Sequence, residues 1–234
     1  MTRQHLSTYP QVQRLLPPTK DPVSLLECYD VVRPRPASRP WISLCMVASL
    51  DGSSVVGGED DGNSRPLSDP VDQQVLLTLR TLADVILVGA STVRRDGYGP
   101  PKKPDQKVAV VSRSADFDFD LPIWTSGRAV LLLPEDAVDV PAPSIRAGRG
   151  DLDIAAAVAQ LDADFVQAEG GASLNGLLTA ADLIDELNLS VSPQIVGGDG
   201  SRITSHAPPV AHRMQLVHVL EHDGFLFTRY VRQR

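Results

Sequence analysis

A carboxylate and two glycines stand where a short apolar strand gives way to a helix, in the stretch FVQAEGGASLNGLL from Phe165 to Leu178. Glu169 directly follows the strand, and Gly170 and Gly171 lead into the helix. A helix N-terminus offers unpaired N–H groups and about half a positive charge, and glycine lets a phosphate approach the backbone closely. The junction is therefore either a pyrophosphate site beside a carboxylate or an ordinary strand–helix turn.

Polar residues follow the other apolar strands of the sequence in the same way. Ligands of open α/β sheets bind outside the carboxyl ends of the strands. Carboxylates, hydroxyls, glycines and one arginine would therefore gather at one edge of the sheet, where they could bind a polar ligand that carries phosphate. The side chains in question are Ser49, Asp51, Ser91, Thr92, Ser112, Arg113 and Glu169.

Motifs of other common sites are missing from the sequence. No GxGxxG follows the first strand and no GxxxxGK[ST] occurs, which argues against a Rossmann dinucleotide domain and a P-loop enzyme. The five histidines form no metal cluster, and Cys28 and Cys45 are not in metal-ligand spacing. No metal site is therefore expected.

The elements that must position the strand-end residues can be read from periodicity. Apolar runs without alternation are typical of strands buried on both faces, whereas DPVDQQVLLTLRTLA has helical spacing after a good cap at Asp69-Pro70. Strands are expected at 41–48, 84–89, 107–112, 129–133, 165–168, 186–195, 214–222 and 225–233, and helices at 69–83, 153–161 and 173–181. This alternation predicts an α/β three-layer sandwich with a mostly parallel, mixed sheet, which ends in an antiparallel hairpin around Asp223-Gly224.

Composition restricts the class of protein further. The chain has 234 residues, 42% of them hydrophobic, and a net charge of −7, as expected of a globular protein without a sequence-independent grip on nucleic acid. No apolar run has membrane-spanning length, the N-terminus lacks a signal-peptide core, and the cysteine usage suits the cytoplasm. Residues 1–40 are rich in proline and are expected to form an arm with one short helix in DPVSLLECYDVV, and residues 41–234 a single domain.

Four motifs, in this order and spacing, resemble the reductase domain of bacterial riboflavin biosynthesis. They are SLDG (49–52), NSRPLS (63–68) before a helix with LR near its end, ADVILVGASTVRRDGYGP (83–100) and AEGGASLNG (168–176). The resemblance runs from about Trp41 to the C-terminus and implies a fold similar to that of dihydrofolate reductase. The zinc deaminase motifs of bifunctional relatives, His-x-Glu and Pro-Cys-x-x-Cys, are missing, so a stand-alone reductase is expected.

The resemblance also implies a reaction and a set of site residues. The family reduces 5-amino-6-(5-phosphoribosylamino)uracil to its ribitylamino form with NADPH, and it forms homodimers. The match would make Glu169 and Asp51 the catalytic residues. It would place the cofactor on Thr92, Asp96, Ser112, Arg113, Gly170, Gly171, Ala172, Ser173, Leu174 and Asn175, and the substrate on Asn63, Arg80, Lys103 and Glu169.

The sequence departs from the family at two places, and simpler interpretations remain open. Ser53 stands where the family usually has a basic residue after SLDG, and lysines replace an arginine in DGYGPPKK. Reduction of another heterocycle, such as dihydrofolate or a dihydropteridine, and NADPH binding without catalysis are the alternatives. Among the residues, Asp96 could pair with Arg94 or Arg95, and Tyr98 could be structural.

Overall fold

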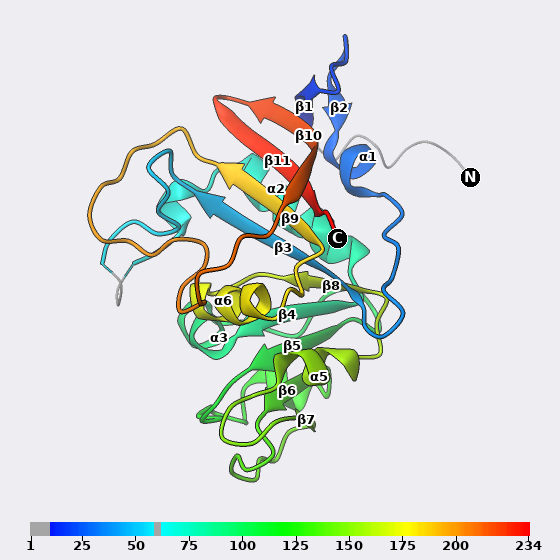
Figure 1. Ribbon diagram of the computed structural model, residues 1–234, viewed down its shortest axis with the longest axis vertical. Helices are drawn as coiled ribbons and strands as arrows, with labels where there is room; N and C mark the ends of the chain where they lie inside the picture. Colours follow the sequence, from blue (N-terminus) through cyan, green and yellow to red (C-terminus); the bar gives the residue numbers. More distant parts are fainter. Residues whose placement is uncertain (1–9, 59–61) are drawn as a thin grey trace.

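The computed structural model describes residues 10–58 and 62–234 (Figure 1). Its helices are α1 (Leu25–Tyr29), α2 (Pro70–Leu82), α3 (Ala90–Asp96), α4 (Pro122–Thr125), α5 (Ile154–Ala159) and α6 (Ala172–Ala180), with a 3-10 turn, η2, at Arg65–Leu67. Its strands are β1 (Gln11–Leu16), β2 (Val23–Ser24), β3 (Trp41–Ala48), β4 (Val85–Gly89), β5 (Lys107–Val111), β6 (Ala129–Leu133), β7 (Ser144–Arg146), β8 (Phe165–Ala168), β9 (Glu186–Val191), β10 (Met214–His222) and β11 (Phe225–Arg232). Among the described residues, no helix combines the length and apolarity needed to cross a membrane.

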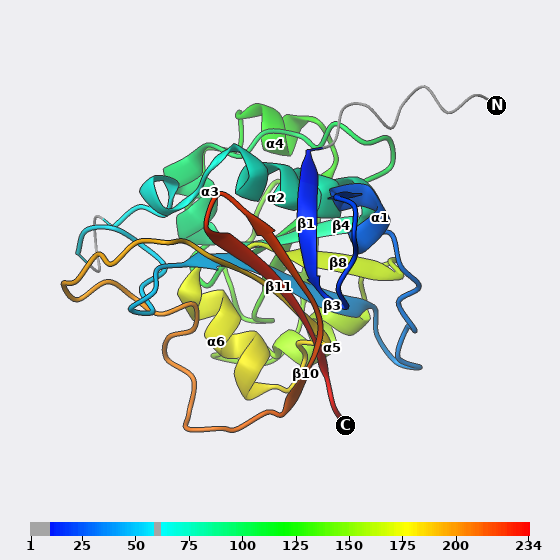
Figure 2. The ribbon, with the colours of Figure 1, turned by 90° about the horizontal axis from the view of Figure 1, so that it is seen from above.

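All strands belong to one mixed sheet, in the order β2-β1-β10-β11-β9-β3-β8-β4-β5-β6-β7. The strands from β9 to β7 in this order run parallel, and β11, β10 and β1 are added antiparallel. Helices α1 to α4 cover one face of the sheet, and α5 and α6 cover the other (Figure 2). This arrangement confirms the expected α/β class with a mostly parallel mixed sheet and a closing hairpin.

The central strands are apolar on both faces because each face is covered. On β4, Val85 and Leu87 pack with α5 and α6, whereas Ile86 and Val88 pack toward α3 and α4. The hairpin turn at Asp223-Gly224 has φ of 48° and 82°, the left-handed conformation that Asp-Gly favours in a two-residue loop. The continuous apolar runs and the hairpin signal were therefore correct predictors.

Helix α3 lies outside the helices that the sequence predicts. Its residues, ASTVRRD, lack an apolar stripe, and the helix spans only Ala90–Asp96. It begins directly after β4 without a side-chain cap and ends at Gly97, whose φ of 68° closes the helix in the left-handed conformation. Such a short helix is held by its place beside the sheet, and intrinsic propensity contributes little.

The N-terminal segment, expected to be an arm with one short helix, has that helix and also contributes to the sheet. Helix α1 has a capping box, in which Ser24 and Glu27 bond each other's backbone amides. Strand β1 pairs with β10, and Val12 and Tyr29 are buried in the same core cluster as Trp41. Residues 10–40 thus share a core with the rest of the chain.

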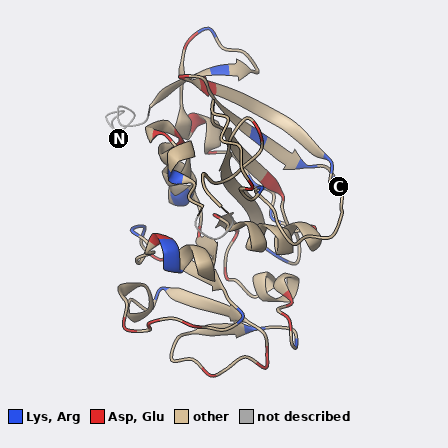
Figure 3. Ribbon diagram, turned by 90° about the vertical axis from the view of Figure 1, so that its left-hand side faces the viewer, with Lys and Arg blue, Asp and Glu red and all other residues tan. Residues whose placement is uncertain are grey.

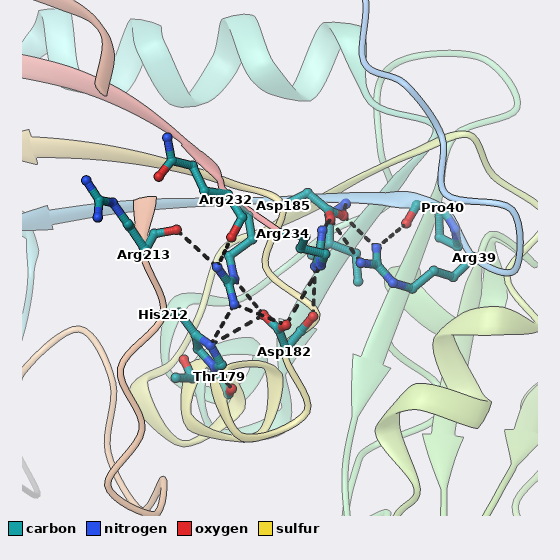
Figure 4. A network of polar contacts seen from close by, with 11 residues as sticks. Arg39, Pro40, Thr179, Asp182, Asp185, His212, Arg213, Arg232 and Arg234 are labelled. Carbon is teal, nitrogen blue, oxygen red and sulfur yellow. Dashed lines mark hydrogen bonds and ion pairs between the residues drawn. The ribbon is translucent and has the colours of Figure 1, made fainter. Parts of the chain in front are cut away.

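Ionic contacts fasten the segment just before β3 and the C-terminal residues to the loop between α6 and β9 (Figure 4). The Asp185 carboxylate is fully buried and accepts hydrogen bonds from Arg39, from Arg234 and from the Ile42 amide. Arg232 is paired with the neighbouring Asp182 at 2.8 Å. These contacts lie at the amino ends of β3 and β9, the edge opposite the strand-end residues considered above.

Candidate active site

The strands that end in polar residues are neighbours in the sheet. β3, β8, β4 and β5 are adjacent and parallel, so their carboxyl ends meet at one edge. Figure 3 faces that edge, toward which β3 and β9 point in Figure 1, and both signs of charge lie on it. The topology therefore brings Glu169 between the ends of β3 and β4, as the parallel arrangement predicts.

Glu169 is the centre of a hydrogen-bonded group that also contains Arg80 and Tyr98. The Arg80 guanidinium donates from Nε to Oε1 and from Nη2 to Oε2, both at 2.6 Å. The Tyr98 hydroxyl donates to Oε2 at 2.6 Å and lies 3.3 Å from Arg80 Nη2. The Glu169 side chain is 3% exposed and that of Arg80 30%. The family resemblance implies separate substrate contacts for Glu169 and Arg80, and the structure pairs the two side chains.

The electrostatics of this group fix its donors and acceptors. Burial and the negative charge of Glu169 raise the pKa of Tyr98 far above its ordinary value. The phenol therefore stays protonated and donates a hydrogen bond to the carboxylate. With two donors already on Oε2 and one on Oε1, the carboxylate has one acceptor position left on Oε1. Arg80 Nη1 donates to none of the described residues. The group can thus offer a ligand one anionic acceptor and guanidinium donors.

Two helix N-termini meet beside this group. The Gly89 amide donates to the Gly170 carbonyl at 2.7 Å, which joins the start of α3 to the start of α6. Neither Gly89 nor Gly171, the cap residues of these helices, makes a side-chain capping bond. Their first-turn N–H groups therefore remain available for an anion. Gly170 has a φ of 84°, a conformation that requires glycine here.

Thr92 gives the second indication that a ligand belongs at this junction. Its hydroxyl is buried and has no hydrogen-bond partner. A Cβ built on Gly171 would lie 3.1 Å from that hydroxyl, so glycine leaves open the space in front of it. Buried polar groups without a partner are rare and call for an explanation. A phosphate oxygen between the hydroxyl and the helix N-termini would satisfy it.

Other residues expected at the cofactor have mixed placements. Ser112 is buried at the end of β5 and accepts from the Ala115 amide at 3.0 Å. Arg113 beside it is exposed and has no partner among the described side chains and carbonyls. Asp96 is the last residue of α3, at the opposite end of the helix from Gly89, and pairs with Arg95 at 3.0 Å. The structure therefore does not bring Asp96 to the helix N-termini.

The first turn of α6 contains the remaining cofactor candidates. Ala172 and Ser173 are its first residues, whereas Leu174 belongs to the apolar core. Asn175 is fully buried, and its amide nitrogen donates to the Ile203 carbonyl at 2.6 Å. The side chains of Asn175 and Leu174 thus support the first turn of α6. The backbone amides of this turn are the groups that can bind a phosphate.

Three of the expected substrate or catalytic residues make hydrogen bonds to backbone groups away from Glu169. Lys103 donates to the Ala83 carbonyl at 2.8 Å, just before β4 begins and away from Glu169. Asn63 is exposed and accepts from the Arg65 amide. Asp51 is exposed, accepts from the Gly197 amide at 2.8 Å and points at that loop backbone. The structure does not bring these three to Glu169.

Tyr98 is a residue of this group that no sequence pattern identifies. A lone tyrosine in a glycine- and proline-rich loop gives no periodic signal, and its contact with Glu169 spans 71 positions of the chain. Its one sign in the sequence is its place two residues after the end of α3, in the segment that follows the carboxyl end of β4. Among the described residues, no cluster of three or more potential metal ligands occurs.

The comparisons with known proteins place this architecture in a family. The model of the RibD C-terminal domain family matches residues 40–224, so the chain belongs to that family. No curated protein sequence matches the chain significantly.

Solved structures share the fold at low sequence identity. A pyrimidine reductase-like protein from Corynebacterium diphtheriae is 22% identical with a TM-score of 0.76, over 91% of this chain and 100% of that one. The riboflavin biosynthesis reductase Rib7 from Saccharomyces cerevisiae is 18% identical with a TM-score of 0.66, over 86% and 93%. A bifunctional diaminohydroxyphosphoribosylaminopyrimidine deaminase/5-amino-6-(5-phosphoribosylamino)uracil reductase from Thermotoga maritima is 19% identical with a TM-score of 0.64, over 83% and 57%.

Proposed function

We propose that this protein is an NADPH-dependent reductase of riboflavin biosynthesis, which reduces 5-amino-6-(5-phosphoribosylamino)uracil to the ribitylamino product. The observation that carries the proposal is the junction itself: two uncapped helix N-termini and the partnerless Thr92 hydroxyl stand beside a buried carboxylate. Membership of the RibD C-terminal domain family and the activities named for its structural neighbours support it.

The residues at the junction fit a dinucleotide. The first-turn amides of α3 and α6 would hold the pyrophosphate, and the Thr92 hydroxyl would donate to one of its oxygens. Ser112 and Arg113 would lie at the adenosine-side ribose and its 2′-phosphate, because a guanidinium matches phosphate geometry. The cofactor supplies the hydride, so the protein needs no side-chain nucleophile.

On the substrate side, the protein would orient the substrate and exclude water from it. Oε1 of Glu169 would accept a polar hydrogen from the sugar or pyrimidine of the substrate, while Arg80 Nη1 would donate to an oxygen. Tyr98 and the Arg80 side-on contact hold the carboxylate in one orientation, so little ordering remains when the substrate binds. Cytoplasmic location is part of the proposal, because the free thiols of Cys28 and Cys45 are both buried and unpaired.

Oxidation of NADPH with each candidate substrate tests the function. The proposal expects turnover with the ribosylamino-pyrimidine phosphate. A reductase of another heterocycle is the second candidate, because a buried Ser53 stands where the family usually has a cation after SLDG and Lys103 is bonded to the Ala83 carbonyl. Turnover with dihydrofolate alone would favour that candidate, and NADPH binding without turnover of either would favour a binding protein.

Arg113→Ala is expected to reduce the preference for NADPH over NADH by about 10- to 100-fold. The estimate corresponds to one or two charge-assisted hydrogen bonds to the 2′-phosphate. Fluorescence titration with both cofactors measures it. Arg35→Ala is the matched control, since Arg35 pairs with Asp164 in an exposed contact at the opposite edge. Equal affinity of the unmodified protein for NADPH and NADH would refute this assignment.

We infer that two copies of the chain associate through the face of the antiparallel strands that turns away from α1 and α2. On β9 and β11, Val191 lies opposite Leu226 and Leu189 opposite Thr228, and this apolar face is partly exposed. Exposed apolar faces of this kind are commonly covered by a partner. Light scattering is expected to give about 50 kDa, twice the 25.2 kDa chain.

Leu226→Arg is expected to shift this mass toward that of the monomer, because it places a charge on the associating face. Leu121→Arg, at another exposed leucine before α4, is the control and should leave the dimer intact. An unmodified protein that stays monomeric at micromolar concentration would contradict the inference.

A further inference from the structure

The long connection from β9 to β10, residues 192–213, crosses the same edge of the sheet as the candidate site. It contains no helix or strand. Its first part is attached to the end of β3: the Leu50 amide donates to the Gln194 carbonyl at 2.8 Å. The Asp51 carboxylate accepts from the successive amides of Val196, at 3.3 Å, and Gly197, at 2.8 Å. A single charged side chain thus holds two backbone groups of this connection.

The middle of the connection is attached to the segment that follows Asp51. The amide and the hydroxyl of Ser54 both donate to the Ser201 carbonyl at 2.8 Å. A Cβ on Gly200 would collide with the Ser53 hydroxyl and lie 3.0 Å from the Val55 carbonyl oxygen, so glycine lets the two segments pack closely here. The contacts from Leu50 to Ser54 therefore fix the path of residues 194–201.

The last part of the connection is attached to the beginning of α6. Ser205 donates its amide to the Ala172 carbonyl at 3.0 Å, and the Asn175 side chain donates to the Ile203 carbonyl at 2.6 Å. A Cβ on Gly176 would overlap the backbone oxygen of Ser205. Glycine inside a helix normally destabilises it, and this close approach is the reason for it here.

We propose that Asp51 is a positioning residue, which holds the β9–β10 connection so that the first turn of α6 stands ready for the phosphates of the dinucleotide. This inference rests on the proposed function. The connection joins Asp51 at one end to Ala172 and Asn175 at the other, and those two residues are in the turn whose amides would meet the pyrophosphate. Asp51 itself does not touch the reacting atoms in this assignment.

The ionisation of Asp51 agrees with this role. The Ser49 hydroxyl, which donates at 2.5 Å, and the amides of Gly197 and Val196 lower the pKa of the carboxyl to about 2. Asp51 is therefore charged throughout the pH range in which reductases are assayed. Its contact with the connection is a constant feature of the enzyme, and titration of Asp51 does not switch it.

Asp51→Asn tests the proposal with two measurements. We expect the NADPH dissociation constant to rise about 3- to 30-fold, because one amide hydrogen bond and the charge assistance of the other are lost. We also expect trypsin to cut faster after the exposed Arg202 in the absence of any ligand, since the connection opens more often. The melting temperature should change little, because Asp51 is at the surface.

Asp84→Asn is the matched control. The Asp84 carboxylate also accepts from two successive amides, those of Asp164 and Phe165, both at 3.0 Å, but at the amino edge of the sheet. The Asp84→Asn variant should alter neither NADPH affinity nor cleavage at Arg202.

Gly176→Ala is the second variant of the proposal. It should weaken NADPH binding although alanine is the better helix former, because its methyl group displaces Ser205.

The outcomes separate this proposal from the proposed function. Slower turnover with unchanged NADPH affinity and unchanged cleavage in Asp51→Asn would overturn the positioning role and make Asp51 a substrate contact. If the unmodified protein binds no NADPH, the proposed function fails. The cleavage rate at Arg202 then still decides whether Asp51 holds the connection, and an unchanged rate overturns that too.

Discussion

Glu169→Gln is expected to lower turnover by about tenfold to a thousandfold while NADPH affinity changes less than about twofold. Glutamine keeps the size of the side chain but removes the charge, and its NH₂ group would face a donor of Arg80 or Tyr98. At least one of the three 2.6 Å contacts on the carboxylate must then be lost. The acceptor for the substrate would be neutral and poorly oriented, whereas the helix N-termini would be untouched.

Gly171→Val is expected to give the opposite pattern. Its side chain would fill the space before the Thr92 hydroxyl, because a Cβ at this position would already lie 3.1 Å from that oxygen, so NADPH binding should weaken first. Absorbance at the NADPH band gives turnover, and fluorescence titration gives affinity for both variants. Glu135→Gln is the control for Glu169→Gln, because the exposed Glu135 carboxylate pairs with Arg149 at the surface, at 3.6 Å. Loss of NADPH binding in Glu169→Gln with normal binding in Gly171→Val would reverse the assignment.

Glu186→Gln is expected to lower the free energy of unfolding by about 3–5 kcal/mol. Glu186 is fully buried and accepts from Arg33 at 3.0 and 3.1 Å and from Arg229 at 2.9 Å. The side chains of Arg33 and Arg229 are 6% and 8% exposed, so the variant leaves them with an excess of buried positive charge. Arg33 also fixes the N-terminal segment, since its guanidinium lies 4.2 Å from the centre of the Phe165 ring. Urea denaturation measures the loss.

The matched control is Asp164→Asn, which removes the exposed pair between Arg35 and Asp164. Their side chains are 48% and 79% exposed, so the change should cost less than about 1 kcal/mol. Similar losses of unfolding free energy in the two variants would contradict the prediction, because they would show that burial does not strengthen the ion pairs of Glu186.

Acid should reveal the same ion pairs. Burial alone would raise the pKa of Glu186, but the hydrogen bonds and charges of Arg229 and Arg33 hold it at about 2, below the ordinary value of 4.5. A lowered folded-state pKa gives stability that is complete above the unfolded-state pKa and is lost as pH falls through the folded-state value. The stability that Glu186 provides should therefore decline between about pH 4.5 and pH 2, and Glu186→Gln should lack this decline.

The sequence by itself determined the elements whose residues pack close to their neighbours in the chain. Asp69-Pro70 predicts the start of α2, and Asp69 indeed caps it by accepting from the Asp72 amide. The uninterrupted apolar run before Gly89 predicts a strand covered on both faces. Each of these features depends on local conformation or on burial of its own side chains, which a single stretch of sequence expresses. The polar residues that follow the apolar strands also predict a shared edge of the sheet, because β3, β8, β4 and β5 are adjacent and parallel.

The tertiary structure alone decided which polar groups satisfy one another. Arg80 and Glu169 are 89 positions apart, and Arg33 and Glu186 are 153 apart. Asp51 reaches Gly197 over 146 positions. A carboxylate in the sequence shows no sign of whether it will meet a ligand, an arginine or a backbone amide, because that choice depends on which loop folds over it. Burial then makes the choice energetically important, since a charge removed from water must find a partner.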